Sequence, residues 1–201
     1  MLIVNPHRVT FDFEEALSKY TGAPYVVATD SCSNALFLCM KYIGVDDQEI
    51  TIPSHTYMSA PCQIIHAGGK VKFKDSPEIL TGPYRLEPTP IWDSALRFTR
   101  DMYQKGQYMC LSFTGPNKIL KLGRGGAILT DDPEAYRWFQ KARYHGRNFV
   151  DHTVDDFDML GWSMNMSPDI AARGLLLMSG MQENPDVSQL YSDLSKFEVY
   201  K

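Results

Sequence analysis

The chain alternates short apolar runs with segments whose apolar side chains recur every three or four residues. The short runs predict strands, because they are rich in β-branched or aromatic side chains and end at glycine, proline or polar residues. They lie at residues 25–29, 49–52, 70–74, 89–92 and 109–113, and the AILT run after Gly125 and Gly126 predicts one more.

Helical periodicity fills most of the remaining chain. It predicts helices at residues 11–20, 31–43, 57–67, 132–145, 169–181 and 187–200, whereas residues 75–90 and 151–158 lack periodicity and predict loops. The order strand, helix, strand, helix, strand within residues 25–74 is typical of right-handed crossovers between parallel strands. The sequence therefore predicts an α/β fold, with a mostly parallel central sheet and helices on both faces.

Composition and charge restrict the class of function. The 201 residues are 44% hydrophobic and 22% charged, which is ordinary for a globular protein with one sizeable core. A formal net charge of −4 provides no basic field that would attract a nucleic-acid backbone. We expect one loose basic group to form a solvated helix face: Arg137, Lys141, Arg143 and Arg147.

Cysteines, histidines and apolar runs bear on cofactors and location. We expect four free, mostly buried cysteines in a reducing compartment, since no CxxC pair occurs: Cys32, Cys39, Cys62 and Cys110. The five histidines lack ligand spacing, so no metal site is expected. The first residues do not resemble a signal peptide, and no apolar run approaches the ~20 residues that cross a bilayer. These features predict a cytoplasmic protein that binds neither a membrane nor nucleic acid.

The junction at residues 29–34 is a candidate anion site, because a strand is expected to end there and a helix to begin. Backbone N–H groups and the positive end of the helix dipole favour an anion at such a junction. The hydroxyls of Ser31 and Ser33 would add donors. The alternative is that Ser31 caps the helix and does nothing more.

Two further strand ends carry candidate site residues. Tyr57 follows the strand that Pro53 closes, at the edge where ligands bind open parallel sheets, and could stack on a flat ring. Asp93 ends an apolar strand, and a buried carboxylate there would require a cation or hydrogen bonds. The alternatives are a core tyrosine and an exposed aspartate that caps the next turn.

Lys118 follows a Gly-Pro turn and precedes a glycine cluster at residues 123–126. Most lysines are surface charges. The run also contains neither the glycine pattern of a phosphate-binding loop nor that of a dinucleotide site. These residues alone leave the role of Lys118 open.

The order of the four segments resembles the sugar-nucleotide aminotransferases of the DegT/DnrJ/StrS type, which have the aspartate-aminotransferase fold (fold type I). That family has Ser-Gly-Thr-Ala-Ala-Leu, Pro-Ser-Phe-Thr-Phe, Glu-Asp-x-Ala-Gln and Ser-Phe-x-x-x-Lys-x-Leu-x-x-Gly-x-Gly-Gly in this order. The corresponding segments here are SCSNAL (31–36), PSHTY (53–57), WDSA (92–95) and SFTGPNKILKLGRGG (112–126), followed by RYHG (143–146) and GWSMNMS (161–167). The resemblance covers roughly residues 16–178.

The resemblance implies a pyridoxal 5'-phosphate cofactor and a role for each segment. Lys118 would form the Schiff base with the cofactor and later move the proton at the substrate carbon, while Asp93 would keep the pyridine nitrogen protonated. Tyr57 would stack on the ring, and Ser163 would reach the cofactor of the other subunit in a homodimer with shared active sites. The implied cofactor-binding residues are Ser31, Cys32, Ser33, Tyr57, Asp93, Ser112, Lys118 and Ser163.

Several residues depart from the family pattern. Cys32 replaces the glycine of the phosphate turn, and Leu96 replaces the glutamine after the acid. One extra residue separates Ser112 and Phe113 from Lys118, but the spacing from Lys118 to Gly123 is kept, so Lys121 is a less favoured rival for the attachment site. The family asparagine and arginine near the end are replaced here: Ser163 and Asn165.

The chain has about half the usual family length. We expect a compact cofactor-binding domain over residues 1–182 and a short helical tail at residues 183–201, with the small carboxyl-terminal domain largely absent. The resemblance implies transfer of an amino group from an amino acid, glutamate or glutamine, to a keto-sugar nucleotide. Two alternatives stay open: a catalytically reduced binding or assembly protein, and a pyridoxal-phosphate enzyme with a smaller substrate.

Overall fold

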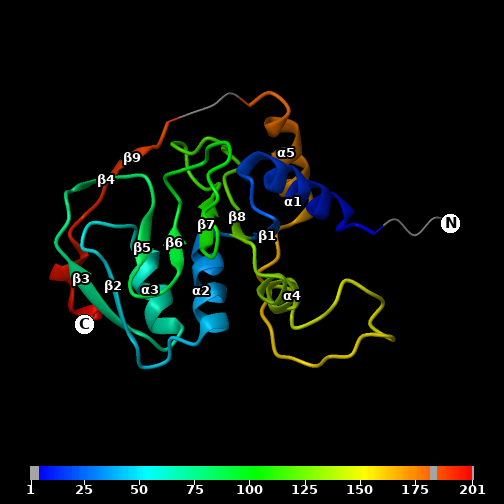
Figure 1. Cartoon of the computed structure of the whole chain (residues 1–201), viewed down its shortest axis with the longest axis horizontal. Helices are drawn as coiled ribbons and strands as arrows, with labels where there is room; N and C mark the ends of the chain where they lie inside the picture. Colours follow the sequence, from blue (N-terminus) through cyan, green and yellow to red (C-terminus); the bar gives the residue numbers. More distant parts are fainter. Residues whose placement is uncertain (1–4, 182–184, 201) are drawn as a thin grey trace.

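The computed structural model describes residues 5–181 and 185–200 (Figure 1). The helices are α1 (Arg8–Thr21), α2 (Cys32–Ile43), α3 (Ser59–His66), α4 (Pro133–Ala142) and α5 (Pro168–Met178), with two short 3-10 helices, η1 (Leu194–Lys196) and η2 (Glu198–Tyr200). The strands are β1 (Tyr25–Thr29), β2 (Glu49–Pro53), β3 (Lys70–Lys74), β4 (Ile79–Thr81), β5 (Tyr84–Leu86), β6 (Ile91–Asp93), β7 (Tyr108–Ser112), β8 (Gly126–Thr130) and β9 (Ser188–Leu190).

The central sheet has the strand order β1-β8-β7-β6-β5. Only β6 and β7 are parallel neighbours in it, and the other three pairs are antiparallel. The parallel pair β2-β3 lies beyond β5, where Thr51 and Glu87 exchange backbone hydrogen bonds. The α/β class is confirmed, but the sheet is mixed rather than mostly parallel. In two of the antiparallel pairs the chain turns back directly, from β5 to β6 through residues 87–90 and from β7 to β8 through residues 113–125. The parallel strands β6 and β7 are joined by residues 94–107, which contain no helix either.

Helices cover both faces of this sheet, as predicted. Alternate side chains of β1 point to opposite faces, so Val27 packs in one core cluster with α2, while Val26 and Ala28 pack in another with α1. The same alternation separates Cys110 from its neighbours in β7. Figure 1 shows α2 on one side of the sheet, and α1 with α5 on the other.

Two segments differ from the prediction. Residues 75–90 are not a loop throughout, because they contain β4 and β5, and β5 is a strand of the central sheet. Residues 187–200 form β9 and two 3-10 helices instead of one helix, and β9 pairs with β4. Strands of three residues show no readable periodicity, and their pairing depends on distant partners. The predicted boundary between residues 1–182 and 183–201 lies outside the described residues, so this division stays a prediction.

A buried ion pair joins α1, β1 and α4. The Arg143 side chain is fully buried; its Nη1 donates to Glu14 Oε1 and to Ala28 O, and its Nη2 donates to Gln140 Oε1. Glu14 Oε1 also accepts from the Ala28 N–H at 2.8 Å. The prediction that Arg143 lies on a solvated helix face is therefore wrong. Tertiary packing against α1 brings a carboxylate to it, which the local sequence does not show.

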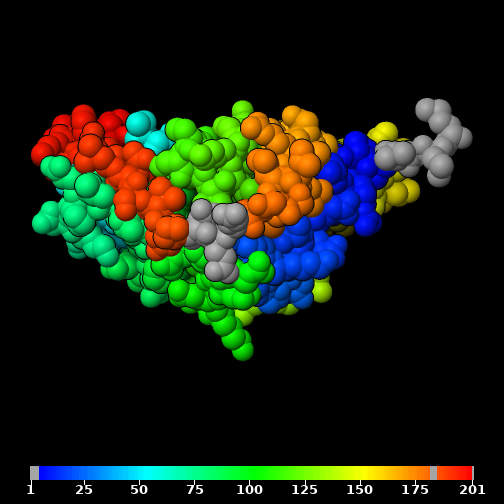
Figure 2. All heavy atoms as spheres, turned by 90° about the horizontal axis from the view of Figure 1, so that it is seen from above, coloured from blue at the N-terminus to red at the C-terminus, as the bar shows by residue number. Residues whose placement is uncertain are grey.

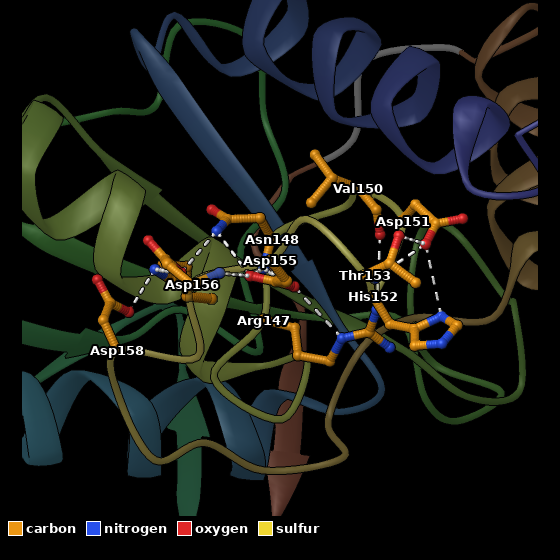
Figure 3. A network of polar contacts seen from close by, with 10 residues as sticks. Arg147, Asn148, Val150, Asp151, His152, Thr153, Asp155, Asp156 and Asp158 are labelled. Carbon is orange, nitrogen blue, oxygen red and sulfur yellow. Dashed lines mark hydrogen bonds and ion pairs between the residues drawn. The ribbon is translucent and has the colours of Figure 1, made fainter.

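The acidic segment after α4 is irregular, as predicted, but it is held by side-chain contacts (Figure 3). The buried Asp155 carboxylate accepts hydrogen bonds from Asn148 Nδ2 (3.0 Å) and from the N–H groups of Asn148 and Asp156. Lys141 of α4 forms ion pairs with Asp156 and Asp158. These contacts fold the segment back onto α4.

The remaining structural findings concern cysteines, metals and membranes. All four cysteines are free, and three of them are buried, as predicted. Within the described ranges, no group of three His, Cys, Asp or Glu side chains could hold a metal ion. In the same part of the chain, no helix is both long and apolar enough to pass through a bilayer.

We expect Arg143→Met to lower the free energy of unfolding by ~3–5 kcal/mol, because it leaves the Glu14 carboxylate buried without a cation. Urea unfolding followed by circular dichroism measures this change. Arg8→Met is the control, since Arg8 pairs with Asp12 at 2.9 Å on the surface and should change stability little. Equal stability of the two variants would contradict the structural role of the buried pair.

Candidate active site

A cavity of about 750 Å³ lies where the amino end of α2 meets the ends of β6 and β7. Its walls also include the loops after β2 and β7 and the segment that contains β9. All the predicted cofactor-binding residues except Ser163 line it: Ser31, Cys32, Ser33, Tyr57, Asp93, Ser112 and Lys118. These residues are far apart in sequence, so the fold brings them together.

The amino end of α2 supplies donors for an anion. Ser31 caps the helix, since its Oγ accepts from the Asn34 N–H at 3.2 Å, and the other N–H groups of the first turn have no partner within the helix. Gly126 packs directly against this turn: a Cβ there would lie 2.4 Å from Cys32 N. Only glycine therefore allows β8 to approach the helix so closely. The dipole and these donors can bind a phosphate group.

Asp93 holds a buried carboxylate at the end of β6; the residue is 7% exposed. Its Oδ1 accepts from the Ala95 N–H and its Oδ2 from the Tyr84 hydroxyl, both at 2.9 Å. Burial raises the pKa of Asp93, while the two hydrogen bonds and the charge of Lys118 act in the opposite direction. The alternative of an exposed aspartate is excluded. The carboxylate is well placed to meet a cationic group in the cavity.

Lys118 is buried on the opposite side of the Ala95 peptide, and its Nζ donates to Ala95 O at 2.8 Å. Ala95 therefore contacts both charged groups, Asp93 through its N–H and Lys118 through its carbonyl. Burial lowers the pKa of Lys118, and the Asp93 charge opposes this effect. A larger fraction of this amine is neutral near pH 7 than in an ordinary lysine, which favours nucleophilic attack. Lys121 is exposed and does not line the cavity.

Two tyrosines stand in the walls of the cavity. Tyr57 is 53% exposed, so it is not a core tyrosine. The ring of Tyr191 lies 6.5 Å from it between centroids, at an interplanar angle of 62°. Burial and the nearby Asp93 charge raise the pKa of Tyr191, which keeps its phenol neutral. Both rings are available to contact a flat ligand.

The segment at residues 186–194 forms one wall of the cavity. The residues that line it are Gln189, Leu190, Tyr191, Ser192 and Leu194. Asp186 anchors one end through a two-point ion pair with Arg97, and Leu194 N–H anchors the other by donating to Ser54 O at 2.8 Å. Figure 2 shows this segment, in orange to red, lying along the molecular surface beside the green part of the chain.

Ser163 lies in a different place from the other predicted residues. It lines a neighbouring cavity of about 310 Å³, together with Asp30, Arg124 and Asn165. Arg124 lines both cavities, and its Nη2 donates to Asp30 Oδ2 at 2.9 Å. The exposed Ser163 therefore does not face Lys118 of its own chain.

Sequence reasoning missed four residues of the larger cavity or its immediate support: Tyr84, Asn117, Arg124 and Tyr191. Arg124 lies within the glycine cluster at residues 123–126. A single cation in that cluster was a signal of a binding site that the sequence offered. Asn117 Nδ2 donates to Gln189 Oε1 at 2.6 Å, a contact between segments that no local pattern connects. Tyr84 lies in a segment predicted as a loop, and Tyr191 lies in one predicted as a helix. No sequence pattern therefore indicated that either residue belongs to the site.

A sequence profile of the DegT/DnrJ/EryC1/StrS aminotransferase family matches residues 5–81 and 100–191. The chain belongs to this family. Residues 82–99, which include Tyr84 and Asp93, lie between the two matched ranges.

Two curated proteins have related sequences. Spore coat polysaccharide biosynthesis protein SpsC of Bacillus subtilis is 39% identical over 79 residues, which are 37% of this chain and 20% of that protein. The UDP-4-amino-4,6-dideoxy-N-acetyl-beta-L-altrosamine transaminase of Campylobacter jejuni is 24% identical over 220 residues, covering 86% of this chain and 57% of that protein. The longer of these two matches thus spans little more than half of the relative.

Solved structures of aminotransferases share the fold. PseC of Helicobacter pylori, an aminotransferase involved in the biosynthesis of pseudoaminic acid, superposes with a TM-score of 0.71 at 15% identity, covering 86% of this chain and 57% of PseC. The putative sugar aminotransferase Spr1654 of Streptococcus pneumoniae gives 0.69 at 20% identity, covering 86% and 59%. The predicted aspartate-aminotransferase-like fold is confirmed.

We expect Lys118 to be methylated by formaldehyde and borohydride at lower pH than an ordinary exposed lysine, because burial lowers its pKa. Mass spectrometry of peptides from pH 6 to 10 measures the pH of half-modification. In Asp93→Asn this pH should fall further, since the Asp93 charge raises the pKa of Lys118. The exposed Lys121 serves as an internal control, and its labelling should not respond to Asp93→Asn. A rise in the Lys118 midpoint in Asp93→Asn would contradict this electrostatic coupling.

Proposed function

We propose that this chain binds pyridoxal 5'-phosphate in the larger cavity and transfers an amino group from glutamate or glutamine to a keto-sugar nucleotide. One observation carries the proposal: a single cavity holds an amine whose pKa is lowered by burial, a buried carboxylate and a helix amino end. A pyridine ring with an aldehyde and a phosphate needs these three partners. A volume of about 750 Å³ lies within the range of ligand-binding pockets.

The residues present fit the cofactor at both ends. Ser33 and Ser112 would bind its phosphate with the amino end of α2, beside Ser31 and Cys32. Cys32 is a buried residue of the first helical turn, so its backbone can take the part that a glycine backbone has in the family pattern. At the other end, the Asp93 carboxylate would face the ring nitrogen, and Tyr57 would lie against the ring.

When bound, pyridoxal phosphate would supply an aldehyde that bonds to amines and a ring that accepts electrons from the neighbouring carbon. Lys118 would supply the attachment amine, and its Nζ would afterwards hold and move the proton at the substrate carbon. Asp93 would keep the ring nitrogen protonated through its negative charge. The wall at residues 186–194 would limit access of water to the reacting atoms.

Arg124 would bind the anionic part of a substrate. The arginine is exposed at the rim of the cavity, and Asp30 holds its Nη2 at 2.9 Å. Both proposed substrates carry anions, a carboxylate in the donor and phosphates in the acceptor, and a guanidinium can hold either with two hydrogen bonds. The charge of this rim residue therefore favours the proposed substrate classes.

We also infer a homodimer with shared active sites, in which a second copy of the chain contributes Ser163. The exposure of Ser163 and its place in a separate cavity support this arrangement, because the residue does not line the Lys118 cavity of its own chain.

The attachment residue is tested by the absorption spectrum of the protein with added pyridoxal phosphate. We expect a visible band in the wild type and its loss in Lys118→Ala, because the band comes from cofactor that is bonded to an amine and Lys118 supplies the amine in the cavity. Lys121→Ala is the matched control and should keep the band. A band that survives in Lys118→Ala and disappears in Lys121→Ala would transfer the attachment to Lys121.

The amino donor is tested by adding glutamate or glutamine to the cofactor-loaded protein. We expect the band to bleach and then to return when a keto-sugar nucleotide is added. A stable band that no donor bleaches would instead favour a catalytically reduced binding protein. Bleaching that only a small keto acid reverses would favour an enzyme with a smaller substrate.

In the same assay Arg124→Gln should raise the donor concentration for half-maximal bleaching about tenfold, with little change in the maximal rate, because a charged contact to the donor is lost. Arg8→Gln is the control, since Arg8 forms a similar ion pair with Asp12 at 2.9 Å far from the cavity in sequence and fold. An unchanged half-maximal concentration in Arg124→Gln would contradict the role of Arg124.

A further inference from the structure

A chain of hydrogen bonds reaches the Asp93 carboxylate from the side of β5. Thr56 Oγ1 donates to Tyr84 Oη at 2.8 Å, and Tyr84 Oη donates to Asp93 Oδ2 at 2.9 Å. All three side chains are buried. Because an ionised carboxylate only accepts hydrogen bonds, the phenol hydrogen points to Asp93, and the Thr56 hydroxyl satisfies the phenol oxygen.

We propose that Tyr84 is a positioning residue that keeps Asp93 ionised and directed at the ring nitrogen of the cofactor, an inference that rests on the proposed function. A hydrogen bond donated to a carboxylate stabilises its charged form. The charged form is the one that would hold a protonated pyridine nitrogen. Tyr84 would therefore act on the cofactor through Asp93, without touching the reacting atoms.

The hydrogen bonds that stabilise the ionised form of Asp93 come from neutral donors. In the described chain, the titratable groups that act on it are Tyr84 from β5, Lys118 from the loop after β7, Cys32 from α2, Cys110 from β7 and Tyr191 from the carboxyl-terminal segment. Lys118 is the one cation of this set, and its Nζ is bound to Ala95 O rather than to the carboxylate. Tyr84 is the side chain of the set that donates a hydrogen bond to Asp93.

The pairing of β5 with β6 explains why Tyr84 reaches Asp93. The two residues are directly opposite each other in the antiparallel register, so their side chains lie on the same face of the sheet. A slip of one residue would turn Tyr84 to the other face. Both residues fall in residues 82–99, outside the ranges that match the family profile. Leu96, which replaces the family glutamine, is buried and does not line the cavity.

Removal of the Tyr84 hydroxyl has a definite expected sign. Burial already raises the pKa of Asp93, and the Tyr84 hydrogen bond opposes that effect. Without the hydroxyl the carboxylate would be a stronger base, so the proton that it shares with the ring nitrogen would lie more on the carboxyl and less on the nitrogen. Binding of the cofactor should weaken as well, because part of the protein would present a neutral acid.

The test uses the full chain, the variant Tyr84→Phe and pyridoxal phosphate labelled with ¹⁵N in the ring. The ¹⁵N chemical shift, measured across pH, reports the protonation of the ring nitrogen directly. We expect the ring nitrogen of Tyr84→Phe to carry less of the shared proton near pH 7, so that the ¹⁵N transition has a smaller amplitude, and the dissociation constant of the cofactor to rise about tenfold. A merely structural role of Tyr84 would not move the protonation of the ring.

Tyr103→Phe is the matched control. It removes the same kind of hydrogen bond, from Tyr103 Oη to Asp131 Oδ1 at 2.8 Å, at a place that does not line the cavity. We expect it to leave both the ¹⁵N transition and the dissociation constant of the cofactor unchanged.

Three outcomes decide between the proposals. Normal cofactor binding by the wild type with an unchanged ¹⁵N transition in folded Tyr84→Phe would overturn the role of Tyr84 and leave the proposed function intact. Failure of the wild type to bind pyridoxal phosphate would overturn the proposed function itself. If Tyr84→Phe does not fold, Thr56→Val is measured, which should change the ¹⁵N shift in the same direction and weaken cofactor binding about threefold. No such change in Thr56→Val would then overturn the inference.

Discussion

The Asp93 carboxylate is buried, and the groups around it offset the free-energy cost of that burial. An unpaired buried charge would cost several kcal/mol, so the carboxylate must be matched by hydrogen bonds or a cation. The turn at Ala95 supplies one N–H, and β5 supplies the Tyr84 hydroxyl. The carbonyl of Ala95 accepts a hydrogen bond from Lys118 Nζ. The N–H and the C=O of this one residue therefore hold the acid and the amine. The proposed chemistry depends on this arrangement.

The cavity around these two groups is assembled from distant parts of the chain. The amino end of α2 and the ends of β6 and β7 form its interior, and the segment at residues 186–194 closes one side. Elsewhere, the buried Arg143–Glu14 pair connects α4, β1 and α1. A chain that spans little more than half of its relatives thus still builds the walls of one cavity.

The sequence predicted most of this site because its residues lie at the ends of helices and strands, or beside a glycine cluster, that the sequence pattern indicates. Ser31 caps a helix after a buried strand, Asp93 ends another strand, and Lys118 precedes a glycine cluster. Their order matched a family pattern, and the structure places them around one cavity. The failures also have local causes. Arg143 looked like a surface cation, since nothing near it in sequence shows that Glu14 meets it.

The sequence by itself determined the α/β alternation, the caps and ends of α2, and the identity of the residues at the strand ends, because these depend on periodicity and on neighbours within a few positions. Tertiary structure alone decided which strands run antiparallel, that β5 enters the sheet and that Tyr84 meets Asp93. It also decided that Tyr191 and Gln189 face the cavity while Ser163 faces another. The physical reason is that strands of three residues and contacts across 70 or more positions, such as Asn117 with Gln189, gain their stability only from partners that packing supplies.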